Sequence, residues 1–148
     1  VDLNYTETQE VRSPDFLRFE SIHYPSILLN SFVISIPELN THEELGISAS
    51  LDNMIGAFPA KHYQGFFSST KNKLAKHSIK HQIHDILKCK MPEFAIIDAS
   101  HKGYILAGVP LEMDKQAAKL LNLDWRSVSH LKLMNEALAP KEKEPEIV

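Results

Sequence analysis

Polar side chains follow two apolar runs that have the composition of buried strands. His42 comes shortly after the run Phe32–Ile36, and Asp98 comes directly after the run Phe94–Ile97. Because open α/β sheets bind ligands at the carboxyl ends of parallel strands, we expect His42 and Asp98 to face one crevice. A carboxylate and a neutral imidazole there can hold a metal ion, form an acid–base pair or bind a polar ligand. The structural alternative is that Asp98 caps a turn and His42 lies on a surface loop.

A second cluster of chemically useful side chains is a set of histidines at helical spacing. His77, His81 and His84 are four and three residues apart, which places them on one helix face, away from an isoleucine stripe. Histidines one turn apart can chelate a transition metal. Lys73 and Lys88 border the same face, and their charges disfavour a bound cation. We therefore expect a solvated face here rather than a metal site.

The single cysteine, Cys89, limits the cofactors that this chain can hold. One cysteine forms no intrachain disulfide, and it cannot ligate an iron–sulfur cluster or a cysteine-rich zinc site. We therefore expect no iron–sulfur cluster within the chain, while the identity of any other cofactor stays open. Lysines beside Cys89 favour its thiolate and the helix C-terminus opposes it, so we expect an inert thiol.

Composition narrows the choice of partner. The formal net charge of −3 gives no general reason to bind nucleic acid, and we expect none as a partner. The longest apolar run is too short to span a bilayer, and the first residues lack the pattern of a signal peptide. We expect a cytoplasmic protein. Its partner would be a small-molecule ligand, a second copy of the chain or another protein.

The elements that must position these residues alternate between strand and helix patterns. Both apolar runs resemble strands buried on both faces, and a periodic helix over 71–88 separates them, as in a parallel β-α-β unit. Further helices are expected over 113–121 and 127–138. The segment 38–58 is expected to be a polar loop with a short apolar stretch, and 101–110 a loop or short hairpin.

These elements predict an α/β fold with a small, mostly parallel sheet flanked by helices. Residues 1–138 are expected to form a single domain, whether the chain is complete or a fragment of a longer protein. Residues 139–148 are expected to be a charged flexible tail.

Short motifs in a consistent order resemble the domain of unknown function 362 family. The similarity is carried in order by the segments Ile36–His42, Leu51–Gly56, Pro92–Asp98 and Met113–Leu121. Members often carry an added ferredoxin-like module with iron–sulfur clusters, which is not expected within these 148 residues, and the activity of the family is unassigned. The resemblance implies that the retained polar residues are His42, Asn53, Asp98 and Asp114.

This chain departs from the family pattern at two putative ligand positions. The family's lysine before Thr-His is Asn40, and its lysine before Asn-x-x-Gly is Asp52. The replacements remove two positive charges and add a negative one. The chain therefore resembles a divergent member, and it is expected to bind an anionic ligand of its relatives poorly or to bind something else.

Two functions follow from these observations. In the first, the domain binds a small polar ligand or a metal at the carboxyl ends of its strands. His42 and Asp98 are then the candidate catalytic or metal-ligating residues, and Asn40, Asn53 and Asp114 the candidate ligand-binding ones. In the second, the domain is a divergent, catalytically silent binding or assembly module. Whether the chain is an enzyme stays open, and convergence of the polar residues on one pocket would separate the two functions.

Overall fold

The computed structural model describes residues 1–59 and 79–140. The strands are β1 (Thr8–Val11), β2 (Ile22–Pro25), β3 (Ile34–Ser35), β4 (Asn40–His42), β5 (Gly46–Ser48), β6 (Phe94–Ala99) and β7 (Tyr104–Gly108). The helices are α1 (Ser26–Leu29), α2 (Ile79–Cys89), α3 (Pro110–Leu120) and α4 (Ser129–Leu138). Short 3₁₀ helices cover Leu3–Tyr5, Asp52–Ala57, Ser100–Lys102 and Trp125–Ser127.

The described strands form small separate sheets. A three-stranded sheet has the order β3-β6-β7, while β1–β2 and β4–β5 are two-stranded. β3 and β6 are parallel, with Ile34 opposite Phe94, which confirms the predicted pairing of those two runs. The remaining strand pairs among the described residues are antiparallel. The content of helices and strands is mixed, as predicted, but the prediction of a mostly parallel sheet is wrong.

Glycines accompany the turns of two of the antiparallel pairs, β4–β5 and β6–β7. Gly46, the first residue of β5, has a φ of +82°, and Gly103, between β6 and β7, has a φ of +83°. Glycine adopts this left-handed conformation without the steric cost that other residues meet. At each site the chain folds back beside the strand it has just left, so the next pairing is antiparallel. The β6–β7 hairpin was among the predicted outcomes for 101–110, whereas β4–β5 was not expected.

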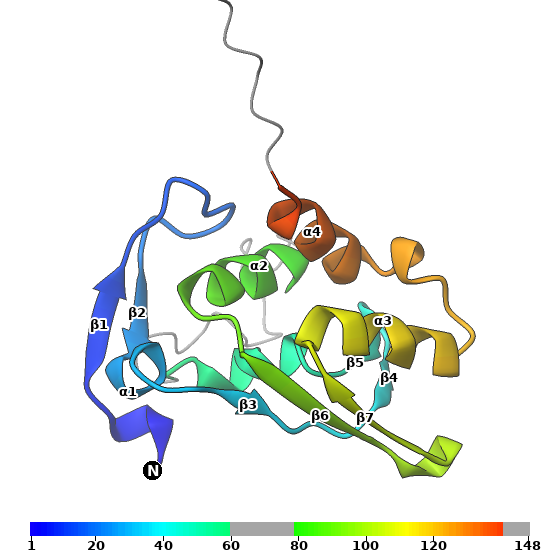
Figure 1. Ribbon diagram of the computed structural model, residues 1–148. Coiled ribbons are helices and arrows are strands. Elements are labelled where there is room, and N and C mark those ends of the chain that lie inside the picture. The colour runs from blue at the N-terminus through cyan, green and yellow to red at the C-terminus, as the bar shows by residue number, and fades with distance from the viewer. Residues whose placement is uncertain (60–78, 141–148) are drawn as a thin grey trace, which may run out of the picture.

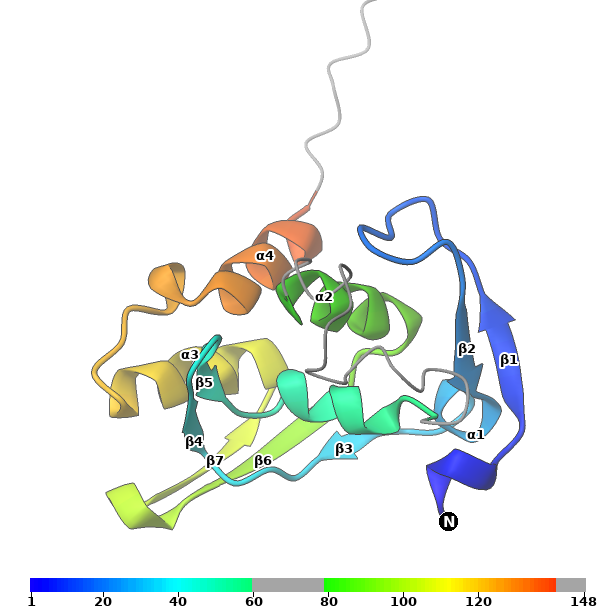
Figure 2. The same ribbon diagram turned by 180° about the vertical axis from the view of Figure 1, so that it is seen from behind.

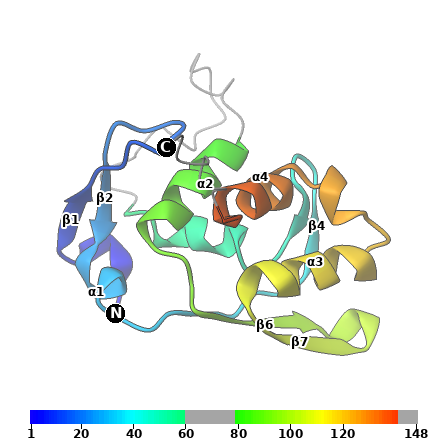
Figure 3. The same ribbon diagram turned by 45° about the horizontal axis from the view of Figure 1, so that its top comes forward.

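Helices cover one face of the three-stranded sheet (Figure 1). α3 packs directly on β6 and β7, and α4 packs against both α2 and α3 (Figure 3). Ala95 and Ile97 of β6 are fully buried beneath this layer, together with Ile86 of α2 and Leu131 of α4. Removing these apolar side chains from water is the main stabilising contribution to such a core.

The described part of the chain that follows β3, residues 36–59, is packed rather than loose. Figure 2 shows the β4–β5 hairpin and the 3₁₀ helix Asp52–Ala57 on the same side of the sheet as the main helices. Leu39, Ile47 and Leu51 from this segment are fully buried. The expectation of a polar loop before Leu51 is therefore wrong, because Leu39, Leu45 and Ile47 reach the core, whereas the apolar stretch expected from Leu51 is buried.

The opposite face of the sheet, called the outer face below, is not covered by any described segment (Figure 1). Alternation and strand register assign to it Phe32, Ile34, Ile36, Phe94, Ile96, Ile105, Ala107 and Val109. Phe32 is 70% exposed, Ile36 67% and Ile105 70%. The prediction that Phe32–Ile36 is buried on both faces is therefore wrong in the described structure. Helices cover only the face of the sheet opposite to the outer face.

Every helix in residues 1–59 and 79–140 is too short or too polar to cross a lipid bilayer. The predicted tail over 139–148 lies almost entirely outside the described residues. So do His77 and the first part of the helix predicted from residue 71.

Candidate functional site

The carboxyl of Asp114 lies in the core, where it joins α3 to the 3₁₀ helix Asp52–Ala57. It accepts hydrogen bonds from the backbone N–H of Ser50 at 2.9 Å and of Leu51 at 3.0 Å, and the Ser50 hydroxyl lies 2.5 Å from it. The side chain is fully buried, and this desolvation raises the pKa of Asp114 to about 7. Asp114 thus satisfies backbone donors that the start of the 3₁₀ helix leaves open.

Asn53 belongs to the same network through Ser35 of β3. Its Nδ2 donates to Ser35 Oγ at 3.0 Å, and Ser35 Oγ donates to the Ser50 carbonyl at 2.9 Å. The structure therefore brings together Asn53 and Asp114, two of the residues that the sequence analysis selected. The network links β3, the 3₁₀ helix and α3.

Asp52, at a position where the resemblance implies a lysine, has a local role. It accepts hydrogen bonds from the Ser48 hydroxyl and from the Ala49 backbone N–H, both at 2.6 Å. Desolvation raises the pKa of its carboxyl above the ordinary value, although these hydrogen bonds act in the opposite direction. Asp52 therefore stabilises the turn from β5 into the 3₁₀ helix.

His42 lies at the end of β4 and organises the β4–β5 turn. Its Nδ1 accepts hydrogen bonds from the backbone N–H of Glu44 at 3.2 Å and of Leu45 at 3.1 Å. An accepting Nδ1 carries no proton, so the neutral ring carries its proton on Nε2. Asn40, at the start of β4, is exposed.

Asp98 is exposed near the carboxyl end of β6. Hydrogen bonds from Ser100, including its backbone N–H at 2.9 Å, hold the pKa of Asp98 below its usual value. A cavity of about 280 Å³ at the β6–β7 turn is lined by Ser100, Gly103, Tyr104 and Ile105, and Asp98 is not one of its lining residues. Within the described residues, no hydrogen bond joins Asp98 to His42, and neither residue belongs to the network of Asp114.

The described residues offer no ready metal centre. Within residues 1–59 and 79–140, no group of three or more His, Cys, Asp or Glu side chains is arranged to hold a metal ion.

Burial raises the pKa of the Cys89 thiol to about 12, which keeps it protonated and unreactive at neutral pH.

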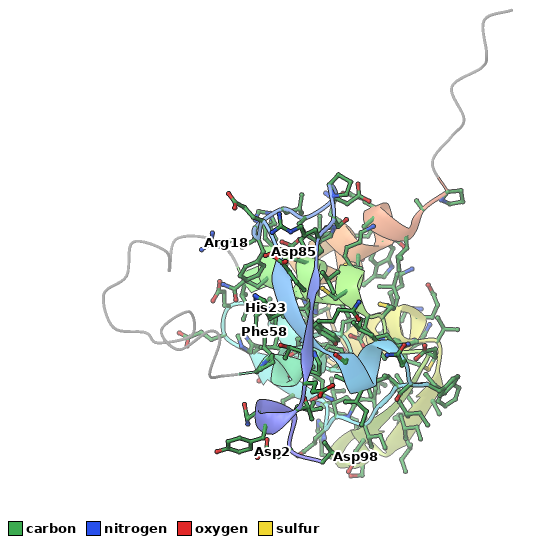
Figure 4. All side chains as sticks on the ribbon, turned by 90° about the vertical axis from the view of Figure 1, so that its left-hand side faces the viewer. Asp2, Arg18, His23, Phe58, Asp85 and Asp98 are labelled. Atoms are coloured by element: carbon green, nitrogen blue, oxygen red, sulfur yellow. The ribbon has the colours of Figure 1, made fainter. Side chains whose placement is uncertain are left out.

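The structure reveals a buried carboxylate that the sequence analysis did not select. Asp85 of α2 is fully buried and accepts hydrogen bonds from three consecutive backbone N–H groups, those of Leu17 (2.8 Å), Arg18 (2.7 Å) and Phe19 (3.0 Å). Its Oδ1 also lies 2.7 Å from Nδ1 of His84. We call this arrangement the Asp85 clamp, because it fastens the loop before β2 to α2. Arg18 and Asp85 lie close together in Figure 4, at the opposite end of the molecule from Asp98.

His84 is buried, with 4% of its surface exposed, so the prediction that it lies on a solvated helix face is wrong. It lines a second cavity, of about 180 Å³, between α2, the end of α4 and the loop before β2. The lining residues are Asp15, His84, Lys88, Glu136, Ala137 and Ala139. The only sequence signal for this site was an Asp directly after a His within the apolar part of the helix.

Comparison with known families identifies the family of this chain. A family model with the description "Domain of unknown function (DUF362)" matches residues 1–108 of the 148-residue chain, which confirms the family expected from the motifs. The matched part ends with β7, so α3, α4 and Asp114 lie beyond it. Searches of curated proteins and of solved structures found no match.

Proposed function

The chain belongs to the DUF362 family, and we propose that it acts as an assembly module whose outer face packs against the outer face of a second copy. The observation that carries this proposal is the exposure of large apolar side chains on one sheet face. Ile36, Ile105 and Val109 are each more than 60% exposed there. Contiguous apolar surface of this kind marks interaction sites in soluble proteins.

The sequence of the sheet strengthens the proposal. Strands that are apolar on both sides are typical of sheets covered on both faces, and the residues of β6 from Phe94 to Ile97 have this composition. The run that contains β3 is also mostly apolar, with Phe32, Ile34 and Ile36 on the outer face. In the described structure, α3 covers one face and nothing described covers the other. A second layer on the outer face would complete the burial that the composition of these strands indicates.

A second copy is the partner that fits this surface. Two apolar strand faces can pack about 10 Å apart with interdigitating side chains, and a two-fold symmetric contact needs only one self-complementary patch. The exposed charges of Glu38, Asp98 and Lys102 lie toward one end of the outer face, near the tip of the β6–β7 hairpin. A charged rim beside an apolar centre is the usual composition of such an interface.

The test is the oligomeric state of the purified chain, measured by light scattering and by sedimentation over a range of protein concentrations. The parent chain should form a dimer, and the double variant Ile36→Asp/Ile105→Asp should be monomeric with unchanged circular dichroism. Leu138→Asp is the matched control, because Leu138 is also 50% exposed but lies on α4, away from the sheet. A parent chain that is monomeric at every concentration would refute the proposal.

A second candidate function is the binding of a polar ligand or metal at the carboxyl end of β6. It is supported by a cavity at the adjoining β6–β7 turn, which Ser100 lines, and by hydrogen bonds from Ser100 that lower the pKa of Asp98. His42 and Asp98 would hold the ligand, with Asn40 beside them. Elemental analysis of untagged protein tests the metal form: bound metal should be lost in both His42→Ala and Asp98→Ala.

We propose a cytoplasmic location and no nucleic-acid partner. A lone thiol needs no oxidising compartment, and the net charge of −3 opposes binding to phosphates.

A further inference from the structure

We propose that the cavity between α2 and α4, called the α2–α4 cavity, binds a small organic cation with N–H donors, such as a primary ammonium group. The contacts would be Nε2 of His84 and the carboxylate of Glu136. This site is separate from the outer face, since α2 and α4 lie in the helix layer on the other side of the sheet (Figures 1 and 3).

The Asp85 clamp determines what His84 offers to a ligand. Three backbone N–H groups donate to Asp85, so its carboxyl acts as an ionised acceptor. His84 Nδ1, 2.7 Å away, must then carry the proton of the neutral ring. Its Nε2 is left with a lone pair, and His84 is one of the residues that line the cavity. A carboxylate that fixes a histidine in this way is the usual support for an imidazole that binds through Nε2.

The charges around the α2–α4 cavity favour a cation. Lys88 Nζ lies 3.8 Å from Asp15 Oδ2, so the one lysine in the lining is paired with a carboxylate. Glu136 makes no ion pair with any residue of 1–59 or 79–140. Apart from His84, the described charged residues of the lining, Asp15, Lys88 and Glu136, carry an excess of one negative charge, which would repel an anion.

Helix ends add to this preference. Lys88 lies in the last turn of α2, and Ala137 lies in the last turn of α4, so the C-terminal turns of both helices line the α2–α4 cavity. The carbonyl groups at a helix C-terminus carry partial negative charge and stabilise nearby cations.

The volume of the α2–α4 cavity and the acceptors in its lining narrow the class of ligand further. A volume of about 180 Å³ is below the ~300–1,000 Å³ of sites for drug-sized ligands, so the bound group must be small. The described residues provide no set of three metal ligands here. An alkylammonium ion fits the acceptors present, because it can donate to both a neutral imidazole and a carboxylate.

The test is an NMR titration of the full chain that follows the imidazole nitrogens of His84. The probes are ethylammonium, tetramethylammonium and acetate at constant ionic strength. Ethylammonium should shift Nε2 of His84 and the amides at the ends of α2 and α4. Tetramethylammonium, which lacks N–H donors, and acetate should not. Equal shifts with both cations, stronger shifts with acetate, or no saturable shift with ethylammonium would each overturn the proposal.

A pair of variants tests whether the carboxylate of Glu136 contributes to ethylammonium binding. Glu136→Gln removes an exposed charge and should leave the fold intact, while weakening ethylammonium binding about fivefold. Glu43→Gln, an exposed glutamate in the β4–β5 turn, is the matched control and should bind as the parent does. Equal affinity of both variants and the parent would contradict the assigned role. Failure of this titration leaves the dimer test unaffected, because the two experiments measure different surfaces.

Discussion

Ser50 Oγ lies 2.5 Å from Oδ1 of Asp114, although 64 residues separate the two in the sequence. The pair joins the start of a 3₁₀ helix to the middle of α3 inside the core. A carboxyl in this position can exist in two protonation states near neutral pH, since burial raises its pKa to about 7. The Ser50 hydroxyl can adjust to either state, because it can also donate to the Pro110 carbonyl at 3.3 Å.

The first prediction is that Asp114 makes the protein less stable as pH rises. The pKa of an aspartate in water is 3.8 and that of Asp114 in the fold is about 7, so the folded state holds a proton that the unfolded state has lost. This contribution is fully present below pH 4 and is lost as pH rises through about 7. The loss is at most about 4 kcal/mol. Urea unfolding across this range should show the slope, and Asp114→Asn should lack it. Parallel pH profiles for the two proteins would contradict this assignment.

The second prediction concerns His130, whose contribution has the opposite sign. Burial lowers its pKa from 6.5 to about 4, and the nearby His42 adds to this effect. As pH falls, His130 therefore binds a proton in the unfolded state before it does so in the folded state. The stabilising contribution is present above pH 6.5 and is lost as pH falls through 4, by at most about 3 kcal/mol. The His130→Leu variant lacks this titrating group. Its free energy of unfolding, measured with urea, should therefore fall less between pH 6.5 and pH 4 than that of the parent protein.

The same variant has a second expected effect. His130 is fully buried, and neither ring nitrogen has a hydrogen-bond partner among the described residues. An apolar side chain of similar size avoids the cost of these unpaired groups, so His130→Leu should stabilise the fold by about 1 kcal/mol at pH 7. Destabilisation at that pH would indicate that His130 has a polar partner, such as a bound water.

The third prediction tests the Asp85 clamp. Asp85→Ala leaves the N–H groups of Leu17, Arg18 and Phe19 without their acceptor and should cost about 3–5 kcal/mol. Hydrogen exchange at these amides should accelerate more than exchange in α3. Asp15→Asn, an exposed change in the same loop, should alter stability by no more than about 0.5 kcal/mol. If both variants unfold alike, the clamp does not fasten the loop.

The fourth prediction contrasts the two faces of the sheet. Ile97 is fully buried on the helix side, so Ile97→Ala should cost about 2–5 kcal/mol of unfolding free energy. Ile36 is 67% exposed, and Ile36→Ala should cost less than about 0.5 kcal/mol in dilute protein. A concentration-dependent loss of stability in Ile36→Ala would be the additional sign of a dimer.

Sequence reasoning succeeded for this fold where local pattern decides the structure. The parallel neighbours β3 and β6 and the helices α3 and α4 were predicted from apolar runs and helical periodicity. It failed for β4–β5, because a hairpin of three-residue strands leaves too short a pattern to recognise. It also failed for the outer face, since an apolar strand pattern indicates burial without indicating which chain supplies the cover.

The residues of the candidate site show the same limit. Asn53 and Asp114 were selected by resemblance, and they share a network that depends on Ser35 and Ser50. The Asp85 clamp was missed because its donors lie 66 to 68 residues earlier in the chain. The spacing of residues within a helix cannot predict a contact between residues so far apart in the sequence.

That long range has a consequence for the folding pathway. Closing a loop of nearly seventy residues is entropically costly and raises the contact order of the native state. α2 can form from local interactions long before the loop that precedes β2 reaches it. The N-terminal segment should therefore dock on α2 in a late folding step. Until it docks, Asp85 is a charged residue on the apolar surface of α2, and docking supplies the backbone N–H groups that satisfy it.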